Sequence, residues 1–185
     1  GIISLEMSNV QLATRIISII SDIEFWKIDQ SKLYNSYEVD KLNKSIDENY
    51  SLPIFMSEKT GVTISDIRAK AMKLIYKNSL DVLFIDYLGL VEPESNKNRN
   101  REQEVSAMSR GLKLLAMELN IPIVVLAQLN RESEKLSNKK PAIHHLRESG
   151  SIEQDADGVI LLHRDWKSGI TANADGSSTE FEADL

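Results

Sequence analysis

Short apolar runs that end in a single polar residue are the feature that most restricts the fold of this chain. Two of them lie in DVLFIDYLGLV at 81–91 and IPIVVLAQLNR at 121–131, and a third closes the stretch HHLRESGSIEQDADGVILLHR at 144–164. Unbroken apolar runs of this length are typical of strands covered on both faces in a parallel sheet, whereas half-buried strands alternate apolar and polar residues. We therefore predict three strands, at 81–86, 121–127 and 158–162.

Helical patterns separate these runs. Ser8 precedes an apolar helical stripe, with Gln11 three residues on as its capping-box partner. Thr63 is positioned to cap a later helix, with Asp66 in its first turn. A third apolar stripe at helical spacing predicts a helix over 105–119. Because strands alternate with helices, the chain is predicted to form a parallel α/β sheet.

The remaining segments complete a single predicted domain. Two shorter strands are expected at 2–6 and 53–57. Polar, unpatterned loops are expected at 92–101 and 131–150, and loops of this length in a compact α/β domain are usually functional or disordered. We assign residues 1–166 to one α/β domain and 167–185 to a poorly patterned tail of the same domain.

Composition excludes several classes of protein. The 185 residues include no cysteine, so disulfides and thiolate metal sites are excluded. The net charge of −6 argues against a domain that is basic overall and binds nucleic acid for that reason. No apolar run approaches the roughly 18 residues of a membrane span. A cytoplasmic protein without a membrane partner is therefore expected.

Three polar residues close predicted strands: Glu6, Asp86 and Gln128. Ligands of an open parallel sheet bind just beyond the carboxyl ends of its strands. The carboxylate of Asp86 can hold Mg²⁺ directly or through water, Glu6 can activate a water molecule, and the amide of Gln128 can donate to a phosphate oxygen. Taken singly, each residue also fits an ordinary cap, turn or solvated position. Together they predict a nucleotide-hydrolysing edge.

Both polar loops carry basic residues that suit a nucleic-acid backbone. The first contains Lys97, Arg99 and Arg101, and the second ends in the sequence Arg147-Glu148-Ser149-Gly150. A guanidinium, a hydroxyl and a flexible backbone can contact phosphates without reading the base sequence. A solvated charged loop is the alternative. No aromatic residues are interleaved, so base stacking is not indicated.

A phosphate-binding loop of the form G-x-x-x-x-G-K-[ST] is absent from the sequence. The pairs Lys44-Ser45, Lys59-Thr60 and Lys167-Ser168 all lack the preceding glycines. The chain therefore offers the acidic and sensor residues of an ATP site without its phosphate cradle.

Four stretches together closely resemble the C-terminal ATPase domain of the DnaB-type replicative DNA helicases. They occur in the family's order and cover most of residues 2–166: SLEMSNVQLATR at 4–15, DVLFIDYLGLV at 81–91, REQEVSAMSRGLKLLAMELNIPIVVLAQLNR at 101–131 and LRESGSIEQDADGVILLHR at 146–164. RecA-type recombinases share the fold and the strand-end acid, but not the RESG-x-IEQDAD stretch. The resemblance implies a RecA-like, mostly parallel sheet flanked by helices, the core of a P-loop NTPase that is incomplete here.

The resemblance also implies roles by position. Glu6 would be the catalytic glutamate that activates water, Asp86 the Walker B aspartate that serves Mg²⁺, and Gln128 the γ-phosphate sensor. ATP and Mg²⁺ would be the cofactors of the intact parent protein. The parent would be an ATP hydrolase that unwinds duplex DNA by translocating on one strand.

The same resemblance implies partners. Arg147, Glu148 and Gly150 would lie on the central-channel loop that follows single-stranded DNA. The parent would work as a homo-hexamer with ATP at its subunit interfaces. A primase and a helicase loader are expected as further partners in the primosome, in a bacterial or phage setting associated with the nucleoid.

The sequence departs from the family pattern at both ends. It begins just after the family's phosphate-loop strand and helix, and it stops before the final lysine- and arginine-bearing strands. The missing strand would lie between those at 121–127 and 158–162, so we expect the last strand to be displaced, to pair with its new neighbour, or to be completed by another chain. The fragment alone is expected to be inactive. The alternatives are a shortened relative that acts as a DNA- or protein-binding module, and a RecA-like recombinase or clock-type ATPase.

Overall fold

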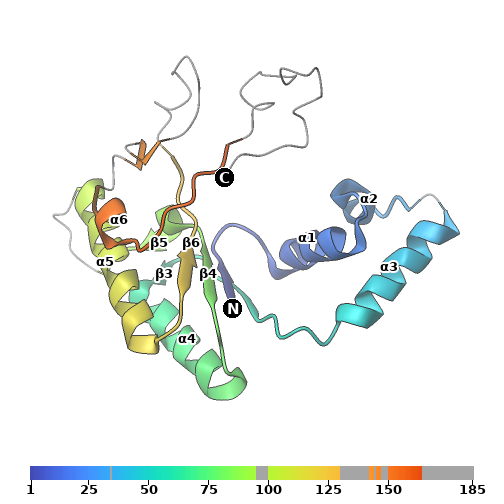
Figure 1. Ribbon diagram of the computed structural model, residues 1–185, viewed down its shortest axis with the longest axis horizontal. Coiled ribbons are helices and arrows are strands. Elements are labelled where there is room, and N and C mark those ends of the chain that lie inside the picture. Colours follow the sequence, from blue (N-terminus) through green and yellow to red (C-terminus); the bar gives the residue numbers. More distant parts are fainter. Residues whose placement is uncertain (34, 95–99, 130–141, 144, 147–149, 164–185) are drawn as a thin grey trace, which may run out of the picture.

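A four-stranded parallel sheet is the centre of the computed structural model, which describes residues 1–33, 35–94, 100–129, 142–143, 145–146 and 150–163 (Figure 1). Its strands lie in the order β2, β1, β4, β6. Their bounds are β1 Ile2–Ser4, β2 Met56–Glu58, β4 Leu83–Asp86 and β6 Ile123–Val125. A second, smaller sheet pairs β3 (Val62–Thr63) with β5 (Val91–Glu92), again in parallel. The predicted parallel α/β sheet is confirmed.

Helices connect the strands and cover the sheet unevenly. Their bounds are α1 Asn9–Ser21, α2 Phe25–Asp29, α3 Ser36–Asn49, α4 Ile64–Asn78, the short 3-10 helix η1 Leu88–Leu90, α5 Arg101–Leu119 and α6 Gly150–Asp155. Helices α4 and α5 lie on one side of the sheet, whereas α1, α2 and α3 extend from the other side as a helical arm (Figure 1). Within the described chain, no helix has the length and apolar character that crossing a membrane requires.

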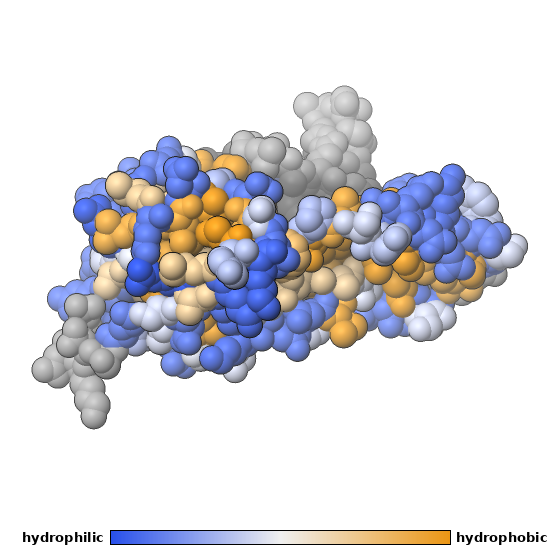
Figure 2. Space-filling view, turned by 90° about the horizontal axis from the view of Figure 1, so that it is seen from below, coloured by the Kyte–Doolittle hydropathy of each residue, from blue (hydrophilic) through white to orange (hydrophobic). Residues whose placement is uncertain are grey.

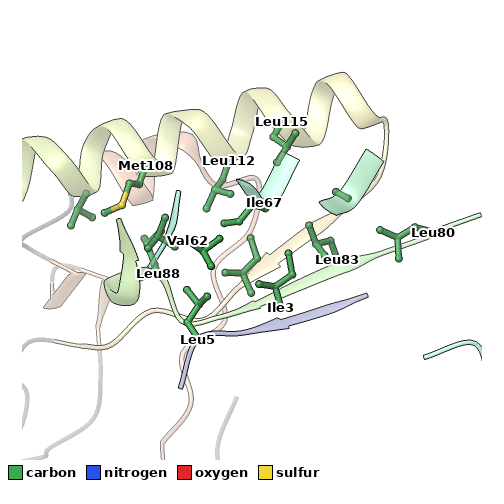
Figure 3. Close-up of a cluster of buried hydrophobic side chains, with 14 residues drawn as sticks. Ile3, Leu5, Val62, Ile67, Leu80, Leu83, Leu88, Met108, Leu112 and Leu115 are labelled. Carbon is green, nitrogen blue, oxygen red and sulfur yellow. The ribbon is translucent and has the colours of Figure 1, made fainter. Parts of the chain in front are cut away.

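The main core lies between the sheet and helices α4 and α5 (Figure 3). Ile3 of β1 and both Leu83 and Ile85 of β4 are completely buried there. Because side chains alternate along a strand, Phe84 and its register partner Val124 point to the opposite face. They remain 38% and 42% exposed. The expectation that β4 and β6 are covered on both faces is therefore met on one face only.

Apolar side chains also reach the surface around the helical arm. Figure 2, the view from below, shows hydrophobic residues (orange) on the body of the molecule and along the arm. In this part of the sequence Val10 and Ile19 of α1 are 74% and 78% exposed, and Tyr50, just after α3, is 82% exposed. Several apolar residues of the helical arm are therefore left exposed in the described structure.

Local sequence signals correctly place the starts of two helices. The Ser8 hydroxyl accepts a hydrogen bond from the amide of Gln11, whose side chain accepts one from the amide of Ser8. Thr63 and Asp66 form the equivalent pair at the start of α4. The backbone amide and the hydroxyl of Thr63 both donate to the carboxylate of Asp66. These two hydrogen bonds, chiefly that of the amide, hold the pKa of the Asp66 carboxyl below its usual value. Both predicted helix caps are confirmed.

The predicted strand at 158–162 is wrong. This segment is described but forms no strand, and Ile160 and Leu162 are 76% and 65% exposed. An apolar run becomes a strand only where a neighbour supplies backbone hydrogen-bond partners, and in the described structure nothing pairs with the outer edge of β6. Of the three arrangements expected for this segment, direct pairing with β6 is not found among the described residues.

Two other boundaries differ from expectation. β2 begins at Met56 rather than at Pro53, which has no backbone N–H to donate to a neighbouring strand. The acidic stretch after the second basic loop forms α6, for which no helix was predicted. The tail at 167–185 lies outside the described residues.

Candidate active site at the carboxyl edge of the sheet

Three adjacent strands, β1, β4 and β6, bring the predicted site residues to one edge. Asp86 is the last residue of β4 and lies in register with Ser4, the last residue of β1. Glu6 follows Ser4 by two residues, and Gln128 follows β6, which pairs with the opposite side of β4. Because all three strands are parallel, their carboxyl ends meet at the same edge of the sheet, at the top of Figure 1. The structure therefore places Glu6, Asp86 and Gln128 on neighbouring strand ends.

Backbone hydrogen bonds continue past the strands and hold this edge together. The amide of Leu5 donates to the carbonyl of Asp86 over 2.7 Å. On the other side of β4, the amide of Leu88 donates to the carbonyl of Leu126 over 2.9 Å. The buried hydroxyl of Ser4 accepts from the amide of Met7 over 2.9 Å, which turns the chain just as it leaves β1. The chain around Glu6 and Asp86 is thus fixed by its own backbone.

The three side chains are open to a ligand. Glu6 and Gln128 are exposed, and Asp86 is half-buried. In the described part of the chain, no hydrogen bond or ion pair occupies either carboxylate. Among these residues there is also no cluster of three metal-ligating side chains. Mg²⁺ usually keeps several waters and needs only one or two protein carboxylates, so Asp86 alone fits the role of holding Mg²⁺ through water.

The segment after Asp86 is shaped by two residues with no predicted part in catalysis. A Cβ atom on Gly89 would lie only 2.7 Å from a ring carbon of Tyr87, so the close approach of this ring requires glycine. The guanidinium of Arg101 donates to the carbonyl of Gly89 over 2.7 Å. Arg101 was assigned from the sequence to the first basic loop, but it is the first residue of α5. Its hydrogen bond to Gly89 holds the chain beyond Asp86 in place. In the sequence, the glycine of DYLGLV is the local sign that the chain beyond Asp86 is closely packed.

Positive charge lies on the β2 side of the edge. Lys59 follows β2 directly, and its ammonium lies 3.9 Å from the carboxylate of Asp66. Lys70 of α4 donates to the hydroxyl of Ser57 over 2.7 Å. Burial lowers the pKa of Lys70, and the nearby charge of Lys59 lowers it further. Lys59 is therefore engaged with Asp66 of α4.

The predicted DNA-binding residues are placed only in part. Arg147 and Glu148 lie outside the described residues, as do most basic residues of both loops. Gly150 is the first residue of α6. His145 is buried, and its Nδ1 accepts a hydrogen bond from the amide of Ala142 over 2.8 Å, which gives it a local structural role.

Comparison with known proteins gives a consistent family likeness. Residues 1–183 match the family model described as DnaB-like helicase C-terminal domain. The chain is 40% identical over 165 residues to the replicative DNA helicase DnaB of Rickettsia typhi, covering 89% of this chain and 33% of the relative. The corresponding protein of Geobacillus stearothermophilus is also 40% identical over 165 residues, with 89% and 36% covered. This chain thus spans about a third of the length of these curated relatives.

Two solved structures extend the likeness to the fold. A DnaB-like replicative helicase, studied together with its interactions with primase, superposes with a TM-score of 0.86 at 30% identity over 99% of this chain and 46% of that one. A second structure, described as an ATPase domain, superposes with a TM-score of 0.83 at 35% identity, covering 89% of this chain and 58% of that one. The parallel sheet with flanking helices is therefore that of the RecA-like ATPase domains of such helicases.

Proposed function

We propose that this chain, which belongs to the DnaB-like helicase C-terminal domain family, is part of the motor domain of an ATP-dependent replicative DNA helicase. The observation that carries the proposal is the meeting of Glu6, Asp86 and Gln128 on three adjacent strand ends. The intact parent unwinds duplex DNA by translocating on single-stranded DNA. We further propose a bacterial or phage setting, with the helicase in the cytoplasm near the nucleoid; the bacterial relatives support the bacterial setting.

Each residue of the edge has a distinct proposed task. Asp86 holds Mg²⁺ through water, and this ion would neutralise phosphate charge as it develops. Glu6, on the neighbouring strand end, accepts a proton from the attacking water. Gln128, on the other side of β4, donates its amide to the γ-phosphate and passes the nucleotide state to the loop that follows. Support comes from the open carboxylates of Glu6 and Asp86 and from the backbone bonds that fix them.

DNA contact is assigned to the second basic loop. Arg147, Glu148 and Gly150 face single-stranded DNA in the channel of a homo-hexamer, and six copies supply avidity that one domain lacks. Primase and a helicase loader are proposed as partners of the parent. A primase interaction is described for one structurally similar helicase.

We propose that the 185-residue chain alone does not hydrolyse ATP, because its sequence contains no G-x-x-x-x-G-K-[ST] loop. Titration of the chain with Mg-ATP in a calorimeter is expected to give no heat of binding. Micromolar binding would contradict this proposal. It would favour the alternative of a shortened relative that binds nucleotide through groups outside the family pattern.

A chimera tests the motor assignment directly. In it, this chain replaces the matching segment of the Geobacillus stearothermophilus helicase, to which it is 40% identical. ATP-dependent unwinding of a forked duplex by the purified hexamer is expected. A hexamer that binds ATP but neither hydrolyses it nor unwinds the fork would contradict the assignment.

Arg147→Ala in this chimera is expected to weaken binding of single-stranded DNA while sparing ATP binding. Loss of one phosphate contact should also lower the salt dependence of log Kd by about 0.7. Fluorescence anisotropy with labelled oligothymidine at several salt concentrations measures both effects. Lys44→Ala is the control, because this exposed lysine lies on α3 of the helical arm. If the two variants bind DNA alike, Arg147 does not belong to the DNA site.

A further inference from the structure

A ladder of polar contacts joins α5 to the segment that follows the second basic loop. The Ser106 hydroxyl donates to that of Ser151 over 2.7 Å. The Arg110 guanidinium lies 3.4 Å from the Asp155 carboxylate, and the Lys113 ammonium pairs with the Asp157 carboxylate. We call the pairs Ser106–Ser151, Arg110–Asp155 and Lys113–Asp157 the α5–α6 ladder.

The ladder lies on one face of α5. Positions 106, 110 and 113 are spaced by four and three residues, so their side chains project from the same side of the helix. Figure 1 shows α6 lying alongside this helix. Ile152 of α6 packs against the main core, which includes residues of α5. The apolar contact seats α6, and the polar pairs fix its register along α5.

The Arg110–Asp155 pair lies in the middle of the ladder, and in it Arg110 compensates the charge of a largely buried carboxylate. The side chain of Asp155 is only 12% exposed, whereas that of Arg110 is 66% exposed. A carboxylate so far removed from water depends on a nearby cation or donor. Losing Arg110 therefore affects α6 more than losing an ordinary surface ion pair.

The same helix is bonded to the nucleotide edge. Asn100 caps its N-terminus, and Arg101 in its first turn donates to the carbonyl of Gly89, three residues beyond Asp86. At its middle, α5 holds α6, whose first residue is Gly150. One rigid helix thus connects the chain next to Asp86 with the chain next to the RESG sequence.

We propose that Arg110 is a positioning residue: through the α5–α6 ladder it holds α6, and with it Gly150 of the proposed DNA-binding site, in place relative to the ATP-binding edge. This role rests on the proposed DNA contact of that site. Arg110 itself touches neither DNA nor nucleotide. Because α5 is bonded both to the chain beyond Asp86 and to α6, a displacement of one of these segments is expected to act on the other.

A charge exchange in this chain tests the proposal. The variants are Arg110→Asp and the double variant Arg110→Asp with Asp155→Arg. Hydrogen exchange of the amides at 151–156 in this chain measures the hold on α6, and anisotropy of the chimera carrying the same variants, with labelled oligothymidine at low salt, measures DNA affinity. Arg68→Asp is the matched control, because it changes the net charge equally and breaks a different ion pair of α5, the one with Glu118.

Arg110→Asp is expected to speed exchange at 151–156 by about fivefold or more and to weaken DNA binding by a similar factor. The double variant should return both towards the original values, while Arg68→Asp should leave exchange at 151–156 unchanged. Unchanged exchange in Arg110→Asp would overturn the anchoring role. Arg110→Asp could instead speed exchange but lose no more DNA affinity than Arg68→Asp. The ladder would then stabilise α6 without positioning the DNA site, and the positioning role would be overturned.

The two proposals fail in distinguishable ways. If the unchanged chimera binds no oligothymidine at low salt, the DNA role of the loop fails, and the positioning role fails with it. If DNA binding responds to Arg147→Ala but not to Arg110→Asp, the DNA role stands and only the positioning role is overturned.

Discussion

Glu6→Gln in the chimera is expected to bind ATP normally and to hydrolyse it about 10²–10⁴-fold more slowly, the usual contribution of a positioned general base. Glutamine keeps the size of the side chain and its hydrogen-bonding oxygen, but it cannot take a proton from water. The structure places Glu6 exposed and without a partner among the described residues, on the strand end next to Asp86. Steady-state ATP hydrolysis and fluorescent-nucleotide binding measure the two effects.

Glu58→Gln is the control for this variant. Glu58 ends β2 at the same edge, but its carboxylate accepts from the amide of Asn9 at the start of α1. Loss of one negative charge from the edge is common to both variants, whereas loss of the proposed base is specific to Glu6. Turnover within a few-fold of the unmodified chimera in Glu6→Gln would remove Glu6 from the catalytic role.

Ile85→Ala is expected to lower the free energy of unfolding by about 2–5 kcal/mol, the range for truncating a buried isoleucine. Ile85 lies on the central strand β4 and is completely buried against the layer of α4 and α5. Since domains are stable by only about 5–15 kcal/mol, this single change removes a large part of the total. Urea denaturation of the chain followed by circular dichroism measures the change.

Val124→Ala provides the comparison on the other face of the sheet. Val124 is in register with Phe84, next to Ile85, and is 42% exposed. It loses fewer carbon atoms from a partly solvated site, so a cost of about 1 kcal/mol or less is expected. Equal destabilisation by the two variants would mean that the open face is covered in solution.

Much of the fold was predictable because the signals are local. Ser8 with Gln11, and Thr63 with Asp66, specify helix starts through bonds across three residues. The three strand-end residues were also predictable, since parallel strands place their carboxyl ends together whatever their order.

The failures concern contacts between distant segments. The run at 158–162 has the composition of a strand, but whether it pairs depends on a neighbour that its own residues do not specify. In the same way, nothing in the composition of α5 indicates that Arg110 meets Asp155, 45 positions later. Such pairs follow from the packing of whole elements, so only the structure identifies them.

The all-parallel pairing of the strands has a consequence for synthesis on the ribosome. Ile2 pairs with Met56 on one side and with Phe84 on the other, so β1 has no hairpin partner nearby in the sequence. Its central neighbour, β4, emerges about 80 residues later, which at about 5–20 residues per second takes several seconds. During that interval the apolar IISL segment lacks β4, one of its two neighbouring strands. Shielding of the nascent chain is therefore expected to matter most before β4 has left the exit tunnel.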